Sequence, residues 1–219
     1  MTFEAAEPKV FVVDDEREVR KALERLLRSA GFPVTAFASA QEFLATVADD
    51  APGCVLLDYQ MPGLSGLELQ DVLAARGMSR QIVFLSGHGD IPKSVQAIQG
   101  GAIDFLEKPA SKELLLAAVE RALARDALER RSRAGMDEVR ARLAQLTPRE
   151  REVMTHVIAG RLNKQIAGLL GTAEKTVKIQ RAAVMKKMGV RSVADLVRCA
   201  EKAGLEPSSP RPGGAQDRS

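Results

Sequence analysis

The sequence predicts an α/β domain with a doubly wound, five-stranded parallel sheet, followed by a smaller all-α domain. The first observation is a series of five short apolar runs, rich in β-branched residues, within the first 125 residues. The second is that stretches with helical spacing separate these runs, an alternation typical of a parallel sheet with helices on both faces. The third is that every apolar pattern from residue 146 to residue 203 has helical spacing.

The expected strands are residues 9–13, 34–37, 54–57, 82–85 and 102–106. Apolar residues three or four positions apart, such as Val19 and Leu23, indicate the helices between them. From Glu113 to about Gln145 the sequence predicts the last helix of this domain. We expect it to continue into a charged linker helix that breaks at residues 132–135.

Four helices are expected in the second half of the chain. Thr147 and Glu150 form a capping box at the start of the first one. Asn163 is expected to cap the second helix and Ser192 the fourth, because short polar side chains favour that position. Gly189 is expected to end the third helix. A short helix, a tight turn and a helix with a basic outer face are typical of a helix-turn-helix.

Composition narrows the class of protein. The chain of 219 residues is 45% apolar and 28% charged, which is ordinary for a globular protein. It has no run of about 18 apolar residues, which a membrane helix needs, and its first residues lack a signal-peptide pattern. We therefore expect a cytoplasmic protein with no membrane partner. Cys54 and Cys199 lack metal-type spacing and are expected to be buried thiols rather than a disulfide.

Charge is distributed unevenly along the chain. Residues 1–126 carry 13 Lys and Arg against 19 Asp and Glu, a net charge of −6, and residues 127–219 carry 19 against 10, a net charge of +9. The two values sum to the +3 of the whole chain. A basic second half suggests a module that faces a polyanion such as nucleic acid, but a basic solvated surface explains the charge equally well.

Acidic, hydroxyl and basic side chains stand at the ends of four predicted strands: Asp14 and Asp15, Asp58, Ser86, and Lys108. In a sheet of order 2-1-3-4-5 these ends converge on one crevice, and Mg²⁺ prefers carboxylate oxygens as ligands. A carboxylate can also attack phosphorus when a cation offsets the charge of the phosphoryl group. Taken singly, the same acids are also explained as caps of helices and turns.

Four motifs occur in order between residues 12 and 109: VVDDE, LLDYQMPGLSGLEL, FLSGHGD and GAIDFLEKP. Together they resemble the receiver domain of two-component response regulators, over roughly residues 8–124. The resemblance implies that Asp58 is the phosphoacceptor. It also implies a partner histidine kinase that phosphorylates this residue.

The resemblance further implies Mg²⁺ as a cofactor. Asp15, Asp58 and the backbone carbonyl of Gln60 are similar in position to the metal ligands of the family, and Asp14 to the acid that reaches the ion through water. Lys108 is similar to the lysine that neutralises the acceptor and phosphoryl oxygens. The peptide bond that follows this lysine is expected to be cis.

Ser86 matches the hydroxyl that moves toward the phosphoryl group in this family, and Phe105 matches the aromatic residue whose rotamer follows that movement. His88 lies near the same pocket and either positions a water or is simply solvated. The resemblance implies that the phosphorylated receiver forms a homodimer through its fourth helix and fifth strand. The candidate dimer contacts on the exposed stripe of that helix are Ile91, Val95 and Gln99.

Residues 146–203 resemble the helix-turn-helix DNA-binding domain of the NarL/FixJ (LuxR-type) regulators, and GHGDIP and DFLEKP resemble the FixJ subgroup. By position, Lys178 and Ile179 match residues that face the bases of double-stranded DNA. Lys164, Thr176 and Arg181 suit contacts with its phosphates. For Lys178 and Arg181 a solvated basic face is the alternative.

Three positions depart from the family pattern. Ala173 stands where an N-cap serine is usual before the third helix, so only Thr172 remains to cap it. Gln180 replaces a frequent histidine, and Ala110 replaces a common phenylalanine. Because of these departures, the resemblance does not indicate which DNA sequence the protein recognises. None of the three positions belongs to the acidic pocket.

The sequence therefore predicts a cytoplasmic transcription regulator switched by phosphorylation, with RNA polymerase as a further partner and no turnover as an enzyme. The expected parts are a receiver domain (1–124), a helical linker (125–145), a DNA-binding domain (146–203) and a disordered tail (204–219). An enzyme of the haloacid-dehalogenase type is one alternative, but it would need two acids separated by one residue. A DNA-binding protein with a decayed receiver is the other, against which the intact set of pocket residues argues.

Overall fold

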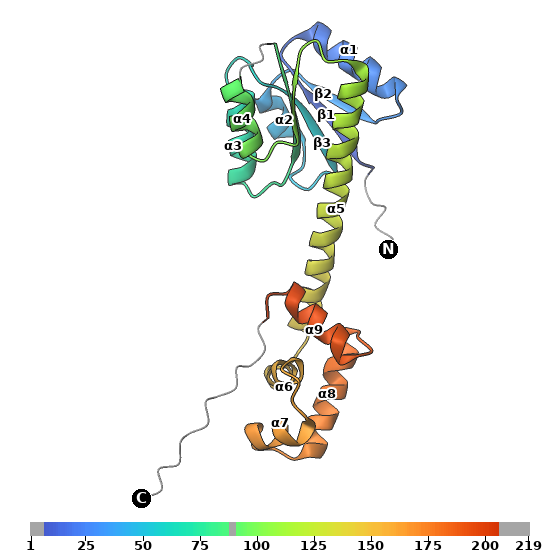
Figure 1. The fold of residues 1–219 in the computed structure, drawn as a ribbon, viewed down its shortest axis with the longest axis vertical. Coiled ribbons are helices and arrows are strands. Elements are labelled where there is room, and N and C mark those ends of the chain that lie inside the picture. Colours follow the sequence, from blue (N-terminus) through green and yellow to red (C-terminus); the bar gives the residue numbers. More distant parts are fainter. Residues whose placement is uncertain (1–6, 88–90, 206–219) are drawn as a thin grey trace, which may run out of the picture. The chain divides into compact units, whose positions relative to one another are not determined.

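A computed structural model describes residues 7–87 and 91–205 of the chain, except for the side chains of Ile91 and Lys93. The chain divides into two compact units between Arg130 and Arg131 (Figure 1). Each unit has its own hydrophobic core. Within the described ranges, no helix has the length and apolar content that crossing a bilayer requires.

The first unit is built on a parallel sheet with the strand order β2-β1-β3-β4-β5, which confirms the predicted order. The strands are β1 (Lys9–Val13), β2 (Val34–Phe37), β3 (Gly53–Asp58), β4 (Gln81–Ser86) and β5 (Asp104–Glu107). Strands β3 and β4 are buried along their whole length because helices cover both of their faces. The first two strands have the predicted limits, and the other three differ from them by one or two residues at each end.

Helices cover the two faces of this sheet, which confirms the doubly wound class (Figure 1). On one face, Leu27 from the first helix packs with Val119 from the fifth. On the other face, Phe43 and Leu69 from the second and third helices are fully buried. The helices are α1 (Arg17–Ser29), α2 (Ala40–Thr46), α3 (Gly66–Ala75), α4 (Ile91–Gln99) and α5 (Lys112–Ala144).

Helix α5 continues through the end of the first unit. It is helical from Lys112 to Ala144, so the predicted break at residues 132–135 is wrong. A single glycine in a helix costs only about 1 kcal/mol relative to alanine. The neighbouring residues are mostly Ala, Arg and Glu, which are strong helix formers and outweigh that cost.

Four helices follow the end of α5 in the described part of the second unit, as the sequence predicts. They are α6 (Pro148–Ile158), α7 (Asn163–Leu170), α8 (Glu174–Met188) and α9 (Val193–Lys202). The side chains at the centre of its core are fully buried: Val153, Ile166, Val177, Val184, Met188 and Leu196. A short helix α7 followed by the longer α8 gives the predicted helix-turn-helix.

Several predicted helix ends are confirmed. Thr147 and Glu150 form the capping box at the start of α6. Ser192 caps α9 by accepting a hydrogen bond from the backbone N–H of Asp195. Gly189 ends α8 in the left-handed conformation, with φ of 65°, which favours glycine because it has no Cβ.

Two predictions about single residues need correction. Leu162, not Asn163, occupies the N-cap of α7, and Asn163 is the first residue inside the helix. Its Oδ1 instead accepts a hydrogen bond from Arg181 Nη1 at 3.1 Å.

Cys54 is buried, and burial raises the pKa of its thiol to about 12, whereas Cys199 is partly exposed. The expectation of two buried thiols therefore holds for Cys54 alone.

Candidate functional site

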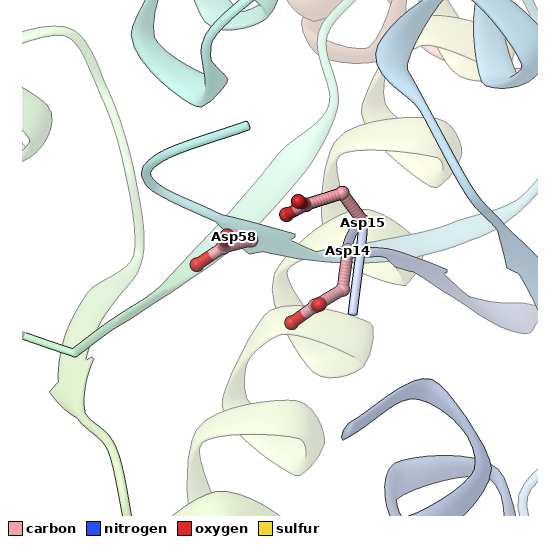
Figure 2. A group of neighbouring side chains, drawn as sticks. All are labelled: Asp14, Asp15 and Asp58. Carbon is pink, nitrogen blue, oxygen red and sulfur yellow. The ribbon is translucent and has the colours of Figure 1, made fainter. Parts of the chain in front are cut away.

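Three carboxylate groups meet at the carboxyl edge of the sheet. Asp14 and Asp15 follow the end of β1, and Asp58 is the last residue of β3. The two strands are parallel neighbours with Val13 opposite Leu57, so all three acids reach the same end of the sheet. Figure 2 shows them side by side, and one carboxylate oxygen from each lies within 4.8 Å of the others.

Lys108 joins these acids from the loop after β5. Its Nζ lies 2.7 Å from Asp14 Oδ2 and 3.0 Å from Asp58 Oδ1. Its backbone N–H donates to the carbonyl oxygen of Ser86 at 2.7 Å, which ties this loop to the end of β4. The peptide bond between Lys108 and Pro109 is cis, as predicted.

Burial and pairing together set the ionisation of the pocket. Burial raises the pKa of Asp58, and the hydrogen bond from Lys108 offsets only part of that effect. Burial alone would lower the pKa of Lys108, but its bonds to Asp14 and Asp58 outweigh burial and raise it. Pairing with the acids therefore favours the cationic form of the lysine, whereas burial disfavours the charged form of Asp58.

The pocket offers the donor atoms that a hard divalent cation prefers. Asp14 and Asp58 are buried and Asp15 is exposed, so the carboxylates are fixed in place and still reachable from solvent. Mg²⁺ binds through one or two carboxylates and keeps several waters, which suits a site that is open on one side. Gln60, whose carbonyl is the other predicted ligand, lies two residues beyond β3 and is exposed.

Two residues that the sequence analysis did not single out hold the acids in place. Arg20 on α1 donates from Nη1 to the backbone carbonyls of Asp14 at 2.6 Å and Asp15 at 2.8 Å. Gly66, the first residue of α3, lies against the end of β3. A Cβ at this glycine would be 2.3 Å from the carbonyl oxygen of Asp58, so only glycine lets α3 approach. The motif LLDYQMPGLSGLEL contains this glycine, but its spacing alone does not reveal the contact.

The two predicted switch residues lie on neighbouring strands. Ser86 is the buried last residue of β4, and Phe105 on β5 is partly buried. The ring of Phe105 lies 5.8 Å from that of Tyr59 and 6.2 Å from that of Phe84, measured between centroids. Tyr59 directly follows Asp58, so an aromatic cluster connects the acidic pocket with β5. The sequence does not distinguish Tyr59 from an ordinary core residue, and its ring is also part of the buried cluster on this face of the sheet.

The predicted dimer contacts lie on α4. Val95 is 47% exposed and Gln99 is exposed, whereas Ala97 between them is buried against the sheet. Ile98 is exposed to the same degree as Val95, although the sequence analysis did not name it. The side chain of Ile91 and the whole of His88 lie outside the described residues, so their predicted roles stay predictions.

The predicted DNA contacts lie on α7 and α8 of the second unit. Lys164, Thr176 and Lys178 are exposed, and the apolar side chain of Ile179 is 63% exposed. Arg181 is only partly exposed because it bonds to Asn163 on α7. The structure thus brings four of the five candidates to the surface of the helix-turn-helix and ties the fifth between its two helices.

Both units match known protein families. Residues 10–120 match the family described as "Response regulator receiver domain". Residues 144–200 match the family described as "Bacterial regulatory proteins, luxR family".

Similar proteins carry both parts in one chain. Nodulation protein W of Bradyrhizobium diazoefficiens is 46% identical over 196 residues, which cover 90% of this chain and 86% of that protein. Response regulator protein TmoT of Ectopseudomonas mendocina is 45% identical, covering 90% of this chain and 89% of TmoT. Transcriptional regulatory protein FixJ of Bradyrhizobium diazoefficiens is 42% identical, covering 90% and 96%.

Solved structures agree with the sequence matches. The response regulator StyR is similar with a TM-score of 0.84 and 48% identity, and the similarity covers 90% of this chain and all of the StyR chain. Full-length FixJ from B. japonicum is similar with a TM-score of 0.55 and 41% identity, covering 91% of this chain and 98% of the FixJ chain.

Proposed function

The chain belongs to the two-component response regulators that join a receiver domain to a LuxR-type DNA-binding domain, and from that premise we propose that phosphorylation of Asp58 switches its binding to DNA. The family consists of transcription regulators and not of enzymes such as the dehalogenase-type alternative. One observation carries the proposal. The ammonium group of Lys108 bridges Asp14 and Asp58, next to Asp15, at the open edge of the sheet.

The pocket supports transfer of a phosphoryl group from a histidine kinase. A carboxylate oxygen of Asp58 attacks the phosphorus of a phosphohistidine, a new O–P bond forms, and the N–P bond breaks. The imidazole leaves with the electron pair of that bond and takes up a proton. Lys108 is already 3.0 Å from the acceptor carboxylate, so its charge lies beside the oxygens on which negative charge develops.

Mg²⁺ is the proposed cofactor of this transfer, with Asp15, Asp58 and the carbonyl of Gln60 as its ligands and Asp14 holding it through water. When bound, the ion neutralises negative charge on the phosphoryl oxygens. Asp14 has a second role, because its Oδ1 also accepts a hydrogen bond from the backbone N–H of Glu16 at 2.8 Å. That bond fixes the orientation of its carboxylate.

Ser86 and Phe105 are proposed to carry the signal from the pocket to the dimer face. Ser86 would turn its hydroxyl toward the new phosphoryl group, and Phe105 would follow into the space that this movement opens. The contacts of Phe105 with Tyr59 and Phe84 support a rearrangement shared by the whole cluster. The proposed homodimer then forms through α4 and β5, with Val95, Gln99 and Ile91 as its contacts.

The second unit is proposed to bind double-stranded DNA with α8 in the major groove. Lys178 and Ile179 face the bases, while Lys164, Thr176 and Arg181 contact phosphates. A dimer holds two such helices and so engages two half-sites with a gain in effective concentration. RNA polymerase is the proposed further partner, and the cytoplasm the proposed location. The proposed domains are residues 1–124 and 146–203, followed by a tail. The residues of α5 between them are divided between the two units, with the boundary after Arg130.

Mass measurement of the intact protein tests the proposal. Incubation with Mg²⁺ and acetyl phosphate is expected to add one phosphoryl group, and Asp58→Asn is expected to abolish the addition. Asp71→Asn, a substitution at an exposed aspartate on α3, is the matched control and should leave the labelling unchanged. Equal labelling of the Asp58→Asn variant and the wild-type protein would place the acceptor elsewhere.

A further inference from the structure

The end of α5 is a structural part of the second unit, although it precedes the helix-turn-helix. Val139 and Leu143 are 6% and 5% exposed and pack in the same core as Val153 and Val184. The match to the luxR family begins only at residue 144. The residues just before it therefore belong to this core without being part of the recognised DNA-binding motif.

Arg142 lies between these two buried residues and reaches the end of α8. Its Nη1 donates to the carbonyl oxygen of Met188 at 2.8 Å. Its Nη2 donates to Glu138 Oε1 at 2.6 Å, one turn earlier on α5, which holds the guanidinium in this direction. Carbonyls in the last turn of a helix have no partner within the helix, and a cation there also interacts favourably with the helix dipole. Arg142 thus caps α8 from another helix.

Two further features at the same end of α8 fit this contact. A Cβ at Gly189 would lie 2.8 Å from Arg142 Nη1, so the glycine that ends α8 also leaves room for the arginine. Lys187, in the last turn, donates from Nζ to the carbonyl oxygen of Gln145 at 3.2 Å and to Glu150 at 2.6 Å. The C-terminal end of α8 is therefore bonded to Arg142 on α5, to Gln145 just after α5, and to Glu150 on α6.

The opposite end of α8 has less support. Ala173 is its N-cap, and no side chain there accepts a hydrogen bond from the first turn. The proposed base contacts, Lys178 and Ile179, lie nearer to this end. A helix of 15 residues is about 22 Å long, so a small change of tilt at Met188 displaces the other end by a larger distance. Groups that bind specifically must be held within about 0.5 Å of their working positions.

We propose that Arg142 is a positioning residue for DNA recognition, which sets the direction of α8 by holding its C-terminal end against α5. It contacts no base and no phosphate in this role. The inference rests on the proposed function, because it assumes that α8 is the helix that contacts DNA. It adds to that function a dependence of DNA affinity on a residue outside the helix-turn-helix.

The test uses the full chain, phosphorylated with acetyl phosphate, and a DNA duplex selected from random sequence with the wild-type protein. Arg142→Ala is expected to weaken binding about 5- to 30-fold, or about 1–2 kcal/mol, because α8 is no longer held at its C-terminal end. Arg142→Lys, which can still donate to the carbonyl of Met188, is expected to restore most of the affinity. Arg140→Ala removes the same charge from an exposed position on α5 and should change binding less than about twofold.

Salt dependence separates positioning from direct contact. Loss of one phosphate contact lowers the slope of log K against log salt by about 0.9. Arg142→Ala is expected to keep the wild-type slope, whereas Lys164→Ala is expected to reduce it. Unchanged affinity of Arg142→Ala, an equal loss in Arg140→Ala, or a reduced slope in Arg142→Ala would each overturn the inference.

Two additional variants keep the result interpretable. If Arg142→Ala does not fold, as judged by circular dichroism, Glu138→Ala takes its place, because it frees the guanidinium and removes only an exposed side chain. It is then expected to weaken binding several-fold, and unchanged affinity would overturn the inference. Lys178→Ala tests the underlying function: if it leaves binding unchanged, α8 is not the contacting helix and the proposed function fails. If it weakens binding while Arg142→Ala does not, only the inference fails.

Discussion

Asp126 Oδ2 accepts a hydrogen bond from the backbone N–H of Gly53 at 3.0 Å, although the two residues are 73 positions apart. The same oxygen accepts a bond from Arg130 Nε at 2.8 Å. Arg130 in turn donates to the carbonyl oxygens of Asp50 and Ala51, just before β3. These bonds fix the middle of α5 to the amino end of β3, at the end of the sheet opposite the acidic pocket.

The first prediction follows from this contact. Asp126→Ala leaves a buried N–H at Gly53 without its partner and is expected to lower the free energy of unfolding of the first unit by about 1–3 kcal/mol. Chemical denaturation followed by circular dichroism measures the change. Asp137→Ala removes an acid from an exposed pair on the same helix and should cost less than about 1 kcal/mol. Equal effects of the two substitutions would show that the buried contact contributes nothing of its own.

The second prediction concerns Lys108. Lys108→Ala is expected to keep Mg²⁺ binding, because the lysine supplies no oxygen ligand, and to prevent phosphorylation from driving dimerisation. The rise in unfolding temperature on addition of Mg²⁺ reports binding, and light scattering after treatment with acetyl phosphate reports dimerisation. Lys112→Ala, at the exposed start of α5, is the control. If the Lys108→Ala variant still dimerises when it is phosphorylated, the lysine is not needed to couple phosphorylation to dimerisation.

The third prediction concerns the start of α8. Ala173 occupies the N-cap without a side-chain acceptor, so Ala173→Ser is expected to stabilise the second unit by about 0.5–2 kcal/mol. The denaturation midpoint of the second unit, compared between Ala173→Ser and the wild-type protein, measures this change in stability. Ala182→Ser, at an exposed position inside α8, introduces the same side chain where no orphan N–H is available and should not stabilise. An unchanged midpoint for Ala173→Ser would mean that the first turn is already satisfied.

The fourth prediction concerns acid stability. The hydrogen bond from Lys187, together with that from the backbone N–H of Thr147, lowers the pKa of Glu150 below its ordinary value of 4.5. A carboxyl whose pKa is lower in the folded state than in the unfolded state stabilises the fold above the unfolded value. That contribution is lost as the pH falls through the lower, folded value. Stability of the second unit is therefore expected to fall below pH 4.5, and less steeply in Glu150→Gln.

Denaturation midpoints measured from pH 6 down to about pH 3 check this fourth prediction. Glu201→Gln, at an exposed position on α9, is the matched control and should follow the wild-type curve. An identical pH dependence of the Glu150→Gln variant would show that the ion pair with Lys187 does not contribute to acid stability.

The sequence by itself determined which elements form and in what order. Apolar periodicity gave the strands and helices of both units, because side chains alternate along a strand and recur every three or four residues along a helix. It also located Asp14, Asp58 and Lys108 at strand ends, since a strand end follows from the local pattern. Two local predictions were wrong. Gly135 does not break α5, because strong helix formers surround it, and Asn163 lies one residue inside α7 rather than at its N-cap.

Only the tertiary structure decided which distant groups meet. Lys108 bonds to Asp14 across 94 positions, Asp126 to Gly53 across 73, and Arg142 to Met188 across 46. Each of these bonds depends on how separate elements pack. The meeting of Lys108 with the acids is expected from the strand order and the resemblance, whereas nothing near Asp126 or Arg142 in the sequence indicates the partner of either residue. Periodicity records which face of an element is buried, but not which residue of another element lies opposite it. The hydrogen bonds that set the acidic pocket and the end of α8 are therefore consequences of packing.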